Sequence, residues 1–316
     1  MASASMKCTD DEFVQLFTQH GATEAARIIG CTERNVYLRR ASLSRLFDLQ
    51  LSAPTKKHAS SENPARINLT IENGTVLVGG DGHYWPGKPS TAHRAFVKFA
   101  KDLKPKALIY NGDAFDGAAI SRHPTIGWES QPSVVEELEA VQLRLGELEQ
   151  ATPRGCRNIW TLGNHDLRFE TRLATVAPEF RKVRGFHLKD NFPTWEPAWA
   201  CWINDDVVIK HRLKGGTHAT HNNVVAAGKT MVTNHLHSLK VTPFSDYSPR
   251  PRWGVDCGTL ADPNGPQFIH YSEDAPKNHR SGFAVLTFKK GRLLWPEVVH
   301  VFDENHVEWR GEVIRV

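Results

Sequence analysis

The chain has 316 residues, of which 40% are hydrophobic and 23% are charged. These fractions are ordinary for a folded protein and exclude a largely disordered or fibrous chain. The length fits one large domain or two unequal ones. With 39 lysines and arginines against 35 acidic residues, the formal net charge of +4 permits an acidic partner such as nucleic acid without requiring one.

The five cysteines are scattered and never form a Cys-x-x-Cys pair. An odd number of unpaired cysteines argues against a disulfide framework or a zinc knuckle and favours a reducing compartment. The first residues lack the apolar run of a secretory signal, and no later run has the length of a membrane span. We therefore expect a cytoplasmic protein.

Hydrophobic residues recur at helical spacing between residues 10 and 51. Gly21 and Gly30 divide this stretch into three short predicted helices. Thr32 is a suitable N-cap for the third helix, and small residues before Gly30 allow two helices to cross closely. The sequence therefore predicts a small all-α domain over residues 1–51.

This N-terminal segment resembles a homeodomain-like helix-turn-helix. The resemblance implies that the third helix lies in a DNA groove, with its polar side chains on bases or phosphates. The side chains concerned are Arg34, Asn35, Tyr37, Arg39 and Arg40. The alternative is a small docking or dimerising bundle, because three-helix units are common and the segment is roughly charge-balanced.

Residues 52–73 are rich in Ser, Pro, Asn and Lys, so we predict that they form a linker. Beyond the linker, short apolar strands alternate with helical stretches. The predicted strands are residues 76–80, 107–110, 158–162, 207–210 and 230–233, and the predicted helices are residues 91–103, 134–150 and 169–180. A predicted antiparallel hairpin over residues 283–302 follows.

Each predicted strand ends in side chains that can bind a metal or move a proton. Because open α/β sheets bind ligands at the carboxyl ends of their strands, we expect these side chains to gather at one edge of a sheet. A lone histidine is more often a surface or core residue than a ligand, so each cluster is weak by itself. In chain order the clusters are Asp81 with His83, then Asp113, then Asn164 with His165 and Asp166, then His211, then His235 with His237.

In this order, the clusters resemble the sequence blocks of the calcineurin-like metallophosphoesterase superfamily over residues 75–260. The resemblance implies an α/β (α+β) chain in which residues 74–316 form a β-sandwich flanked by helices. It also implies two divalent metal ions. One would be held by Asp81, His83, Asp113 and His237, and the other by Asp113, Asn164, His211 and His235.

A carboxylate shared by both ions, here Asp113, can bridge cations about 3.5 to 4 Å apart. Mixed nitrogen and oxygen ligands favour Mn, Fe, Zn, Co or Ni over Ca or Mg, and manganese is our first expectation. The resemblance further implies that a hydroxide bridging the metals attacks phosphorus. His165 would then protonate the leaving group, with Asp166 orienting its ring.

Three further residues bear on this site. Asn234 stands where the family has Gly before His-x-His, so a different backbone turn at His235 is one expectation. Asp116 either hydrogen-bonds to a metal ligand or caps a helix. Arg168 either contacts phosphate or is an ordinary surface residue.

We therefore predict a metal-dependent phosphodiesterase or nuclease that its N-terminal domain brings to DNA, an architecture similar to that of phage- or prophage-encoded members of the family. One alternative is a phosphomonoesterase acting on proteins or nucleotides. Against it, the family's protein phosphatases have Glu at Asp166 and Arg at Gly117. The other alternative is a DNA-binding regulator or assembly factor with a non-catalytic phosphoesterase domain, which the intact ligand set disfavours.

Overall fold

The computed structural model describes residues 8–47, 51, 63–122, 128, 130–268 and 278–316. The chain divides into two compact units, Met1–Glu62 and Asn63–Val316. In the described ranges, no helix combines the length and the apolar character that a bilayer crossing requires.

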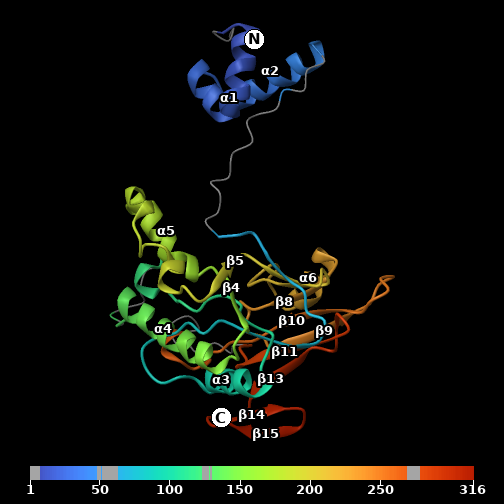
Figure 1. Ribbon diagram of the computed structural model, residues 1–316. Coiled ribbons are helices and arrows are strands. Elements are labelled where there is room, and N and C mark those ends of the chain that lie inside the picture. Colours follow the sequence, from blue (N-terminus) through green and yellow to red (C-terminus); the bar gives the residue numbers. More distant parts are fainter. Residues whose placement is uncertain (1–7, 48–50, 52–62, 123–127, 129, 269–277) are drawn as a thin grey trace. The chain divides into compact units, whose positions relative to one another are not determined.

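The first unit consists of α1 (Asp10–Ile29) and α2 (Glu33–Leu46), drawn in blue in Figure 1. Gly21 interrupts the helical geometry of α1 with φ 76°, and Gly30 ends the helix with φ 74°. The Thr32 side chain caps α2 by accepting a hydrogen bond from a backbone amide. The three helical segments divided at the two glycines are therefore confirmed.

The residues expected to contact DNA separate into two groups. Arg34, Asn35 and Tyr37 are exposed. The guanidinium group of Arg39 instead donates to the Asp10 carboxylate at 2.7 Å and lies over the Phe13 ring. The Arg40 guanidinium donates to the Leu51 carbonyl at 2.9 Å. Contrary to expectation, Arg39 and Arg40 thus make contacts within the unit, because the core of the helices offers them ring faces and acceptors.

The second unit contains two β-sheets, and the larger one carries most of the strands. Its strands are β2 (Gly74–Gly79), β3 (Ala107–Tyr110), β4 (Arg157–Thr161), β5 (Glu196–Ala198), β11 (Gly282–Lys289), β12 (Arg292–Leu293), β13 (Glu297–Val301), β14 (His306–Trp309) and β15 (Glu312–Arg315). The order is β15-β14-β13-β11-β2-β3-β4-β5, with β12 paired to β11. β2 to β5 run parallel, whereas β11 and β13 form the predicted antiparallel hairpin.

The smaller sheet has the order β1-β6-β7-β8-β10-β9. Its strands are β1 (Ile67–Leu69), β6 (Cys201–Ile203), β7 (Val207–Ile209), β8 (Thr230–Thr233), β9 (Lys240–Phe244) and β10 (Arg252–Asp256). β7 and β8 run parallel. Their carboxyl ends therefore lie at the same end of this sheet.

Alternating side chains of the larger sheet fill two apolar cores. Val76 and Val78 of β2 pack with Ile209 of β7 and Val232 of β8 in the core between the sheets. Leu77 points to the opposite face, in a core that also contains residues of three α-helices. This period of two is the geometry of a β-strand buried on both faces.

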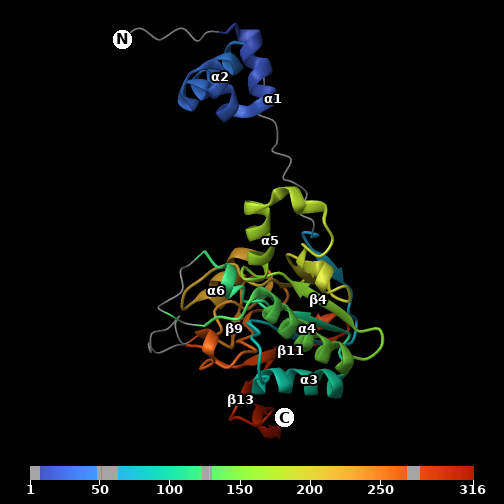
Figure 2. The ribbon, with the colours of Figure 1, turned by 90° about the vertical axis from the view of Figure 1, so that its left-hand side faces the viewer.

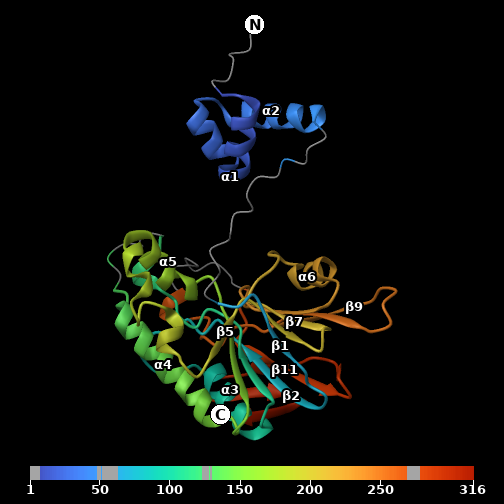
Figure 3. The same ribbon diagram turned by 45° about the horizontal axis from the view of Figure 1, so that its top comes forward.

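Helices cover both outer faces of the two sheets. They are α3 (Thr91–Leu103), α4 (Val134–Ala151) and α6 (Ala219–Ala227). The other helices of this unit are α5 (Asp166–Val176) and the short 3-10 helices η1 (Ala118–Ile120), η2 (Pro178–Lys182) and η3 (Leu188–Asn191). In Figure 3, α3 and α4 lie on one side of the sheets and α6 on the other. The predicted β-sandwich flanked by helices is confirmed.

Two expectations about organisation differ from the structure. The strands that carry the polar clusters divide between two sheets, because β7 and β8 pair with each other and not with β4. Residues 63–73, expected within the linker, belong to the second unit, where β1 pairs with β6. Burial of Leu69 and Ile71 in the core between the sheets accounts for this.

Candidate metal centre

The loops that follow β2, β3, β4, β7 and β8 bring the polar clusters together. These residues form groups of three in which each residue offers one potential ligand atom, a ring nitrogen or a carboxylate oxygen. Within a group, these ligand atoms lie within 4.8 Å of one another. The groups are Asp81 with His83 and His237, Asp113 with His211 and His235, and His83 with Asp116 and His165. The two sheets therefore contribute to one site.

The backbone at this site is strained. Five of the predicted ligands have positive φ angles: Asp81 (53°), His83 (40°), Asp113 (52°), His235 (76°) and His237 (56°). Such angles are unfavourable for residues other than glycine and cost on the order of 1 to 3 kcal/mol each. A fold retains strain of this kind where the direction of the side chains matters, as it does for metal ligands.

Several buried ligand atoms at the site make no hydrogen bond within the described part of the chain. They are Oδ1 of Asp81, Nε2 of His83 and Oδ1 of Asn164, whereas Nε2 of His211 faces the carboxylate of another predicted ligand, Asp113, at 3.1 Å. Burying a polar atom without a partner costs about 1 to 3 kcal/mol. These oxygen and nitrogen atoms are the donor set that suits divalent transition metals, so the residues present fit two such cations.

Hydrogen bonds at the outer nitrogen of two histidines fix which ring nitrogen faces the site. Nδ1 of His211 donates to the Asn111 carbonyl at 2.8 Å, so Nε2 faces the Asp113 carboxylate at 3.1 Å. Nδ1 of His83 donates to Oδ1 of Asp116 at 3.0 Å. Asp116 thus contacts a predicted ligand, one of the two roles the sequence left open. Orientation of a ligand histidine through its other nitrogen is common in metal sites.

The charge of His211 depends on whether a cation is bound. Burial lowers its pKa, but the Asp113 and Asp81 carboxylates prevail and raise the pKa to about 10. Without a metal, a proton on this ring therefore offsets the negative charge of the two carboxylates. A cation entering the site would have to displace that proton.

His165 lies beside the predicted ligands, and its ring is held by Asp116. Its Nδ1 donates to Oδ1 of Asp116 at 2.8 Å, and its Nε2 accepts a hydrogen bond from the Arg168 guanidinium at 3.1 Å. Burial opposes protonation of the ring, but the charges of Asp113 and Asp116 raise the pKa of His165. A histidine that holds its proton more strongly and lies beside the predicted ligands suits proton transfer to a leaving group once Arg168 releases Nε2.

The structural role of Asp166 differs from the expected one. Its carboxylate accepts hydrogen bonds from the backbone amides of Asp113 at 2.9 Å and Gly163 at 2.8 Å, and from the Trp160 indole at 3.0 Å. The expectation that it orients the His165 ring is therefore wrong. α5 begins at Asp166, and this places its side chain beneath the Asp113 loop, away from the ring.

Asn234 does not displace the histidines that follow it. Its side chain accepts a hydrogen bond from the Asn111 amide at 2.9 Å and donates to the Gly258 carbonyl at 2.9 Å. The backbone amide of His235 donates to the Asp81 carboxylate at 2.7 Å. The Asn side chain therefore joins neighbouring loops of the site, and His235 stays in the group with Asp113.

Sequence reasoning missed two aromatic residues at this site. The Phe268 ring lies 5.4 Å from the rings of both His83 and His237, and the His279 ring lies 4.5 Å from that of His237. Phe268 is only 5% exposed and covers one side of the histidine pair. Neither residue follows a predicted strand, so no sequence pattern indicated it.

Comparison with protein families matches residues 74–299 to the calcineurin-like phosphoesterase family. Among solved structures, a single mutant of Vps29 from Entamoeba histolytica has 13% identity and a TM-score of 0.39, covering 77% of this chain and 99% of its own. A serine/threonine phosphatase from Saccharomyces cerevisiae has 14% identity and a TM-score of 0.36, covering 84% and 96%. Comparison with curated proteins gave no match. Since the family match spans most of the chain, the protein belongs to the calcineurin-like phosphoesterase family.

Proposed function

We propose that this protein hydrolyses phosphoesters with two divalent metal ions. The observation that carries the proposal is the convergence of buried oxygen and nitrogen atoms without hydrogen bonds from loops of both sheets. One ion would be held by Asp81, His83, Asp113 and His237, and the other by Asp113, Asn164, His211 and His235. Two bound cations would polarise the phosphoryl group and lower the pKa of water to near neutrality.

Residues around the metal ligands would protonate the leaving group, orient the proton donor and bind the phosphate. We assign His165 as the general acid that protonates the leaving oxygen from Nε2. Asp116 accepts from the opposite nitrogen of the ring and, together with the charge of Asp113, favours the protonated ring by raising the pKa of His165 against the effect of burial. The Arg168 guanidinium donates to Nε2 of His165 at 3.1 Å; with substrate bound, it would instead donate to a phosphate oxygen and leave Nε2 free to carry the proton.

We further propose that the substrate is a phosphodiester of nucleic acid, and that the first unit binds DNA. Two features support this part. Asp116 is followed by Gly117, where the family's protein phosphatases have Arg. The chain therefore lacks, at that position, the positively charged side chain that would bind a doubly charged monoester. Arg34, Asn35 and Tyr37 of α2 are exposed and free to contact a polyanion.

The test is a panel of substrates in the presence of manganese: a bis-nitrophenyl phosphodiester, nitrophenyl phosphate, and single- and double-stranded DNA. The proposal predicts turnover of the diester and of DNA above that of the monoester. Preferential turnover of the monoester would identify a phosphomonoesterase. Tight binding of two metals without turnover of any substrate would identify a non-catalytic domain.

A second experiment tests the role of His165. His165→Asn should keep both metals and slow hydrolysis by about 100- to 10,000-fold, the usual range for losing a general acid. The loss should be smaller for a nitrophenyl leaving group, because such a group departs without a proton. An equal loss for good and poor leaving groups would make His165 a substrate-binding residue instead.

A further inference from the structure

A helical hairpin begins directly at the metal centre. His165 is the N-cap residue of α5, and the chain continues through η2 and returns through η3. We call residues 167–191 the basic arm. Figure 1 and Figure 2 show α5 projecting away from the sheets of the second unit. One end of the arm is therefore next to the predicted general acid, and the other is remote from it.

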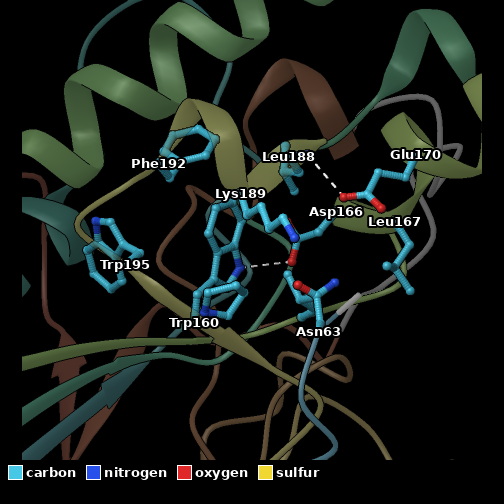
Figure 4. A pocket seen from close by; sticks show the side chains of 11 residues that line it. Asn63, Trp160, Asp166, Leu167, Glu170, Leu188, Lys189, Phe192 and Trp195 are labelled. Carbon is cyan, nitrogen blue, oxygen red and sulfur yellow. Dashed lines mark hydrogen bonds between the residues drawn. The ribbon is translucent and has the colours of Figure 1, made fainter. Parts of the chain in front are cut away.

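The base of the arm is firmly joined to the site. Figure 4 shows the residues that line a small cavity there, with the hydrogen bond from the Trp160 indole to Asp166 at 3.0 Å. The Leu188 amide closes the hairpin by donating to the Glu170 carboxylate at 3.0 Å. Because Asp166 also binds the Asp113 loop, the position of the arm is fixed relative to the metal ligands.

The arm is more basic than the chain as a whole. It contains six arginines and lysines but only three acidic residues. Two of these acids make contacts inside the hairpin: Glu170 accepts from the Leu188 amide, and Asp190 accepts from the Gly185 amide at 2.9 Å. These two acidic residues thus close the hairpin, whereas Glu179 and four of the six cations are exposed, which leaves a surplus of positive charge on the outside.

Four of the cations are exposed. One is Arg181, and the other three are Arg172, Lys182 and Arg184. Arg172 lies one helical turn beyond Arg168, so the two share a face of α5 that leads away from His165. Among the residues that the structure describes, no ion pair involves Arg172, Lys182 or Arg184. Exposed apolar side chains lie between them: Val176 is 58% exposed, Phe180 43% and Val183 45%.

We propose that the basic arm binds single-stranded DNA next to the phosphodiester that is cleaved. This inference rests on the proposed function, since it assigns a strand type and a binding surface to the same site. Exposed cations suit the phosphates of the strand, and an exposed aromatic ring among them suits unpaired bases, whose faces a duplex hides. Continuity with His165 places the bound strand so that one of its phosphates lies at the metal centre.

The test uses the full chain with the substitutions Arg172→Gln, Lys182→Gln and Arg184→Gln combined. The matched control combines Lys101→Gln, Lys289→Gln and Arg315→Gln, which remove the same charge from exposed positions on α3, β11 and β15. For each protein, the concentration of a single-stranded oligonucleotide that gives half-maximal cleavage is measured at several salt concentrations. Hydrolysis of the nitrophenyl phosphodiester serves as the reference activity.

Each lost phosphate contact should flatten the slope of log affinity against log salt by about 0.7 for a single strand. With three cations removed, the slope of the arm variant should be flatter than that of the wild type by up to about 2. Its nitrophenyl diester hydrolysis and the control's salt slope should stay at wild-type values. An arm variant with the control's slope would overturn the inference while the proposed function stands. A fall in its diester hydrolysis would also overturn it, since the arm would then support the metal site. Failure of the wild-type chain to cleave DNA would instead refute the nucleic-acid part of the proposed function.

Discussion

Replacing Asp116 by Asn tests how the site controls His165, the proposed general acid. One oxygen of this carboxylate accepts hydrogen bonds from His165 at 2.8 Å and from His83 at 3.0 Å. Asparagine keeps the shape of the side chain but removes its charge. The protonated ring of His165 therefore loses one of the two carboxylates that stabilise it, and its pKa should fall.

The size of the effect follows from the kind of hydrogen bond that is weakened. A hydrogen bond to a charged group contributes about 1.5 to 3 kcal/mol, and each 1.4 kcal/mol corresponds to about a tenfold change in rate. We therefore expect kcat to fall about 10- to 100-fold, which is also the usual range for residues that orient metal ligands. The fall should be largest for substrates with poor leaving groups.

The assay is the pH dependence of kcat for diesters with good and poor leaving groups, together with metal content. In Asp116→Asn, the alkaline limb of the profile should move to lower pH, because His165 loses its proton more easily. Asp102→Asn, which breaks an exposed ion pair with Lys98 on α3, is the matched control and should leave the profile unchanged. An unshifted limb would refute the reasoning, and restoration of full activity by excess manganese would show that Asp116 acts through His83 alone.

Three other changes test separate parts of the account. Asp113→Ala should abolish metal binding and turnover together, because in the proposed site both cations would share this carboxylate; near-normal turnover with two bound metals would exclude the assignment. In the metal-free protein, the contribution of charged His211 to the stability of the folded state should be complete below about pH 6.5 and lost as pH rises through about 10. Near pH 8 the ring is therefore protonated, so metal uptake should release about one proton from it. Calorimetry in buffers of different ionisation enthalpy measures that release, and a His211→Asn variant that releases as many protons would contradict it. Removal of Met1–Glu62 should leave nitrophenyl diester hydrolysis unchanged but raise the DNA concentration for half-maximal cleavage; equal cleavage of DNA by the truncated and full chains would make the first unit a docking or dimerising module.

The sequence indicated the ligand clusters because their signal is local. Asp81 and Asp113 each come three residues after the last apolar residue of a short run. Parallel strands place their carboxyl ends side by side. The division of these strands between two sheets was missed, because an apolar run shows that a strand exists without showing which strand it pairs with. Strand pairing depends on contacts far apart in the sequence.

Contacts between side chains far apart in the sequence could not be predicted either, as Asp116 and Asp166 show. Asp166 is the sequence neighbour of His165, and nearness in sequence made it the expected partner of the ring. In the structure it is the first residue of α5, and its carboxylate faces the Asp113 loop. Asp116 reaches the ring from the loop after β3, a contact that depends on tertiary structure.

Two other differences from expectation, the end of the linker and the contacts of Arg39, also have physical causes. β1 has only three residues within a polar stretch, and its pairing with β6 determines that it is a strand. Arg39 lies on a helix face that its sequence position predicts to be polar. Its contact with Asp10 comes from the packing of α2 against α1, which helical periodicity does not specify.

The most direct test of the two-metal phosphoesterase is a titration of the metal-stripped chain with manganese, following bound metal and hydrolysis of the nitrophenyl phosphodiester in the same samples. We predict that two ions bind, that turnover rises as the second one binds, and that Asp113→Ala shows neither. Turnover that is independent of bound metal, or two bound ions without any turnover, would contradict the account.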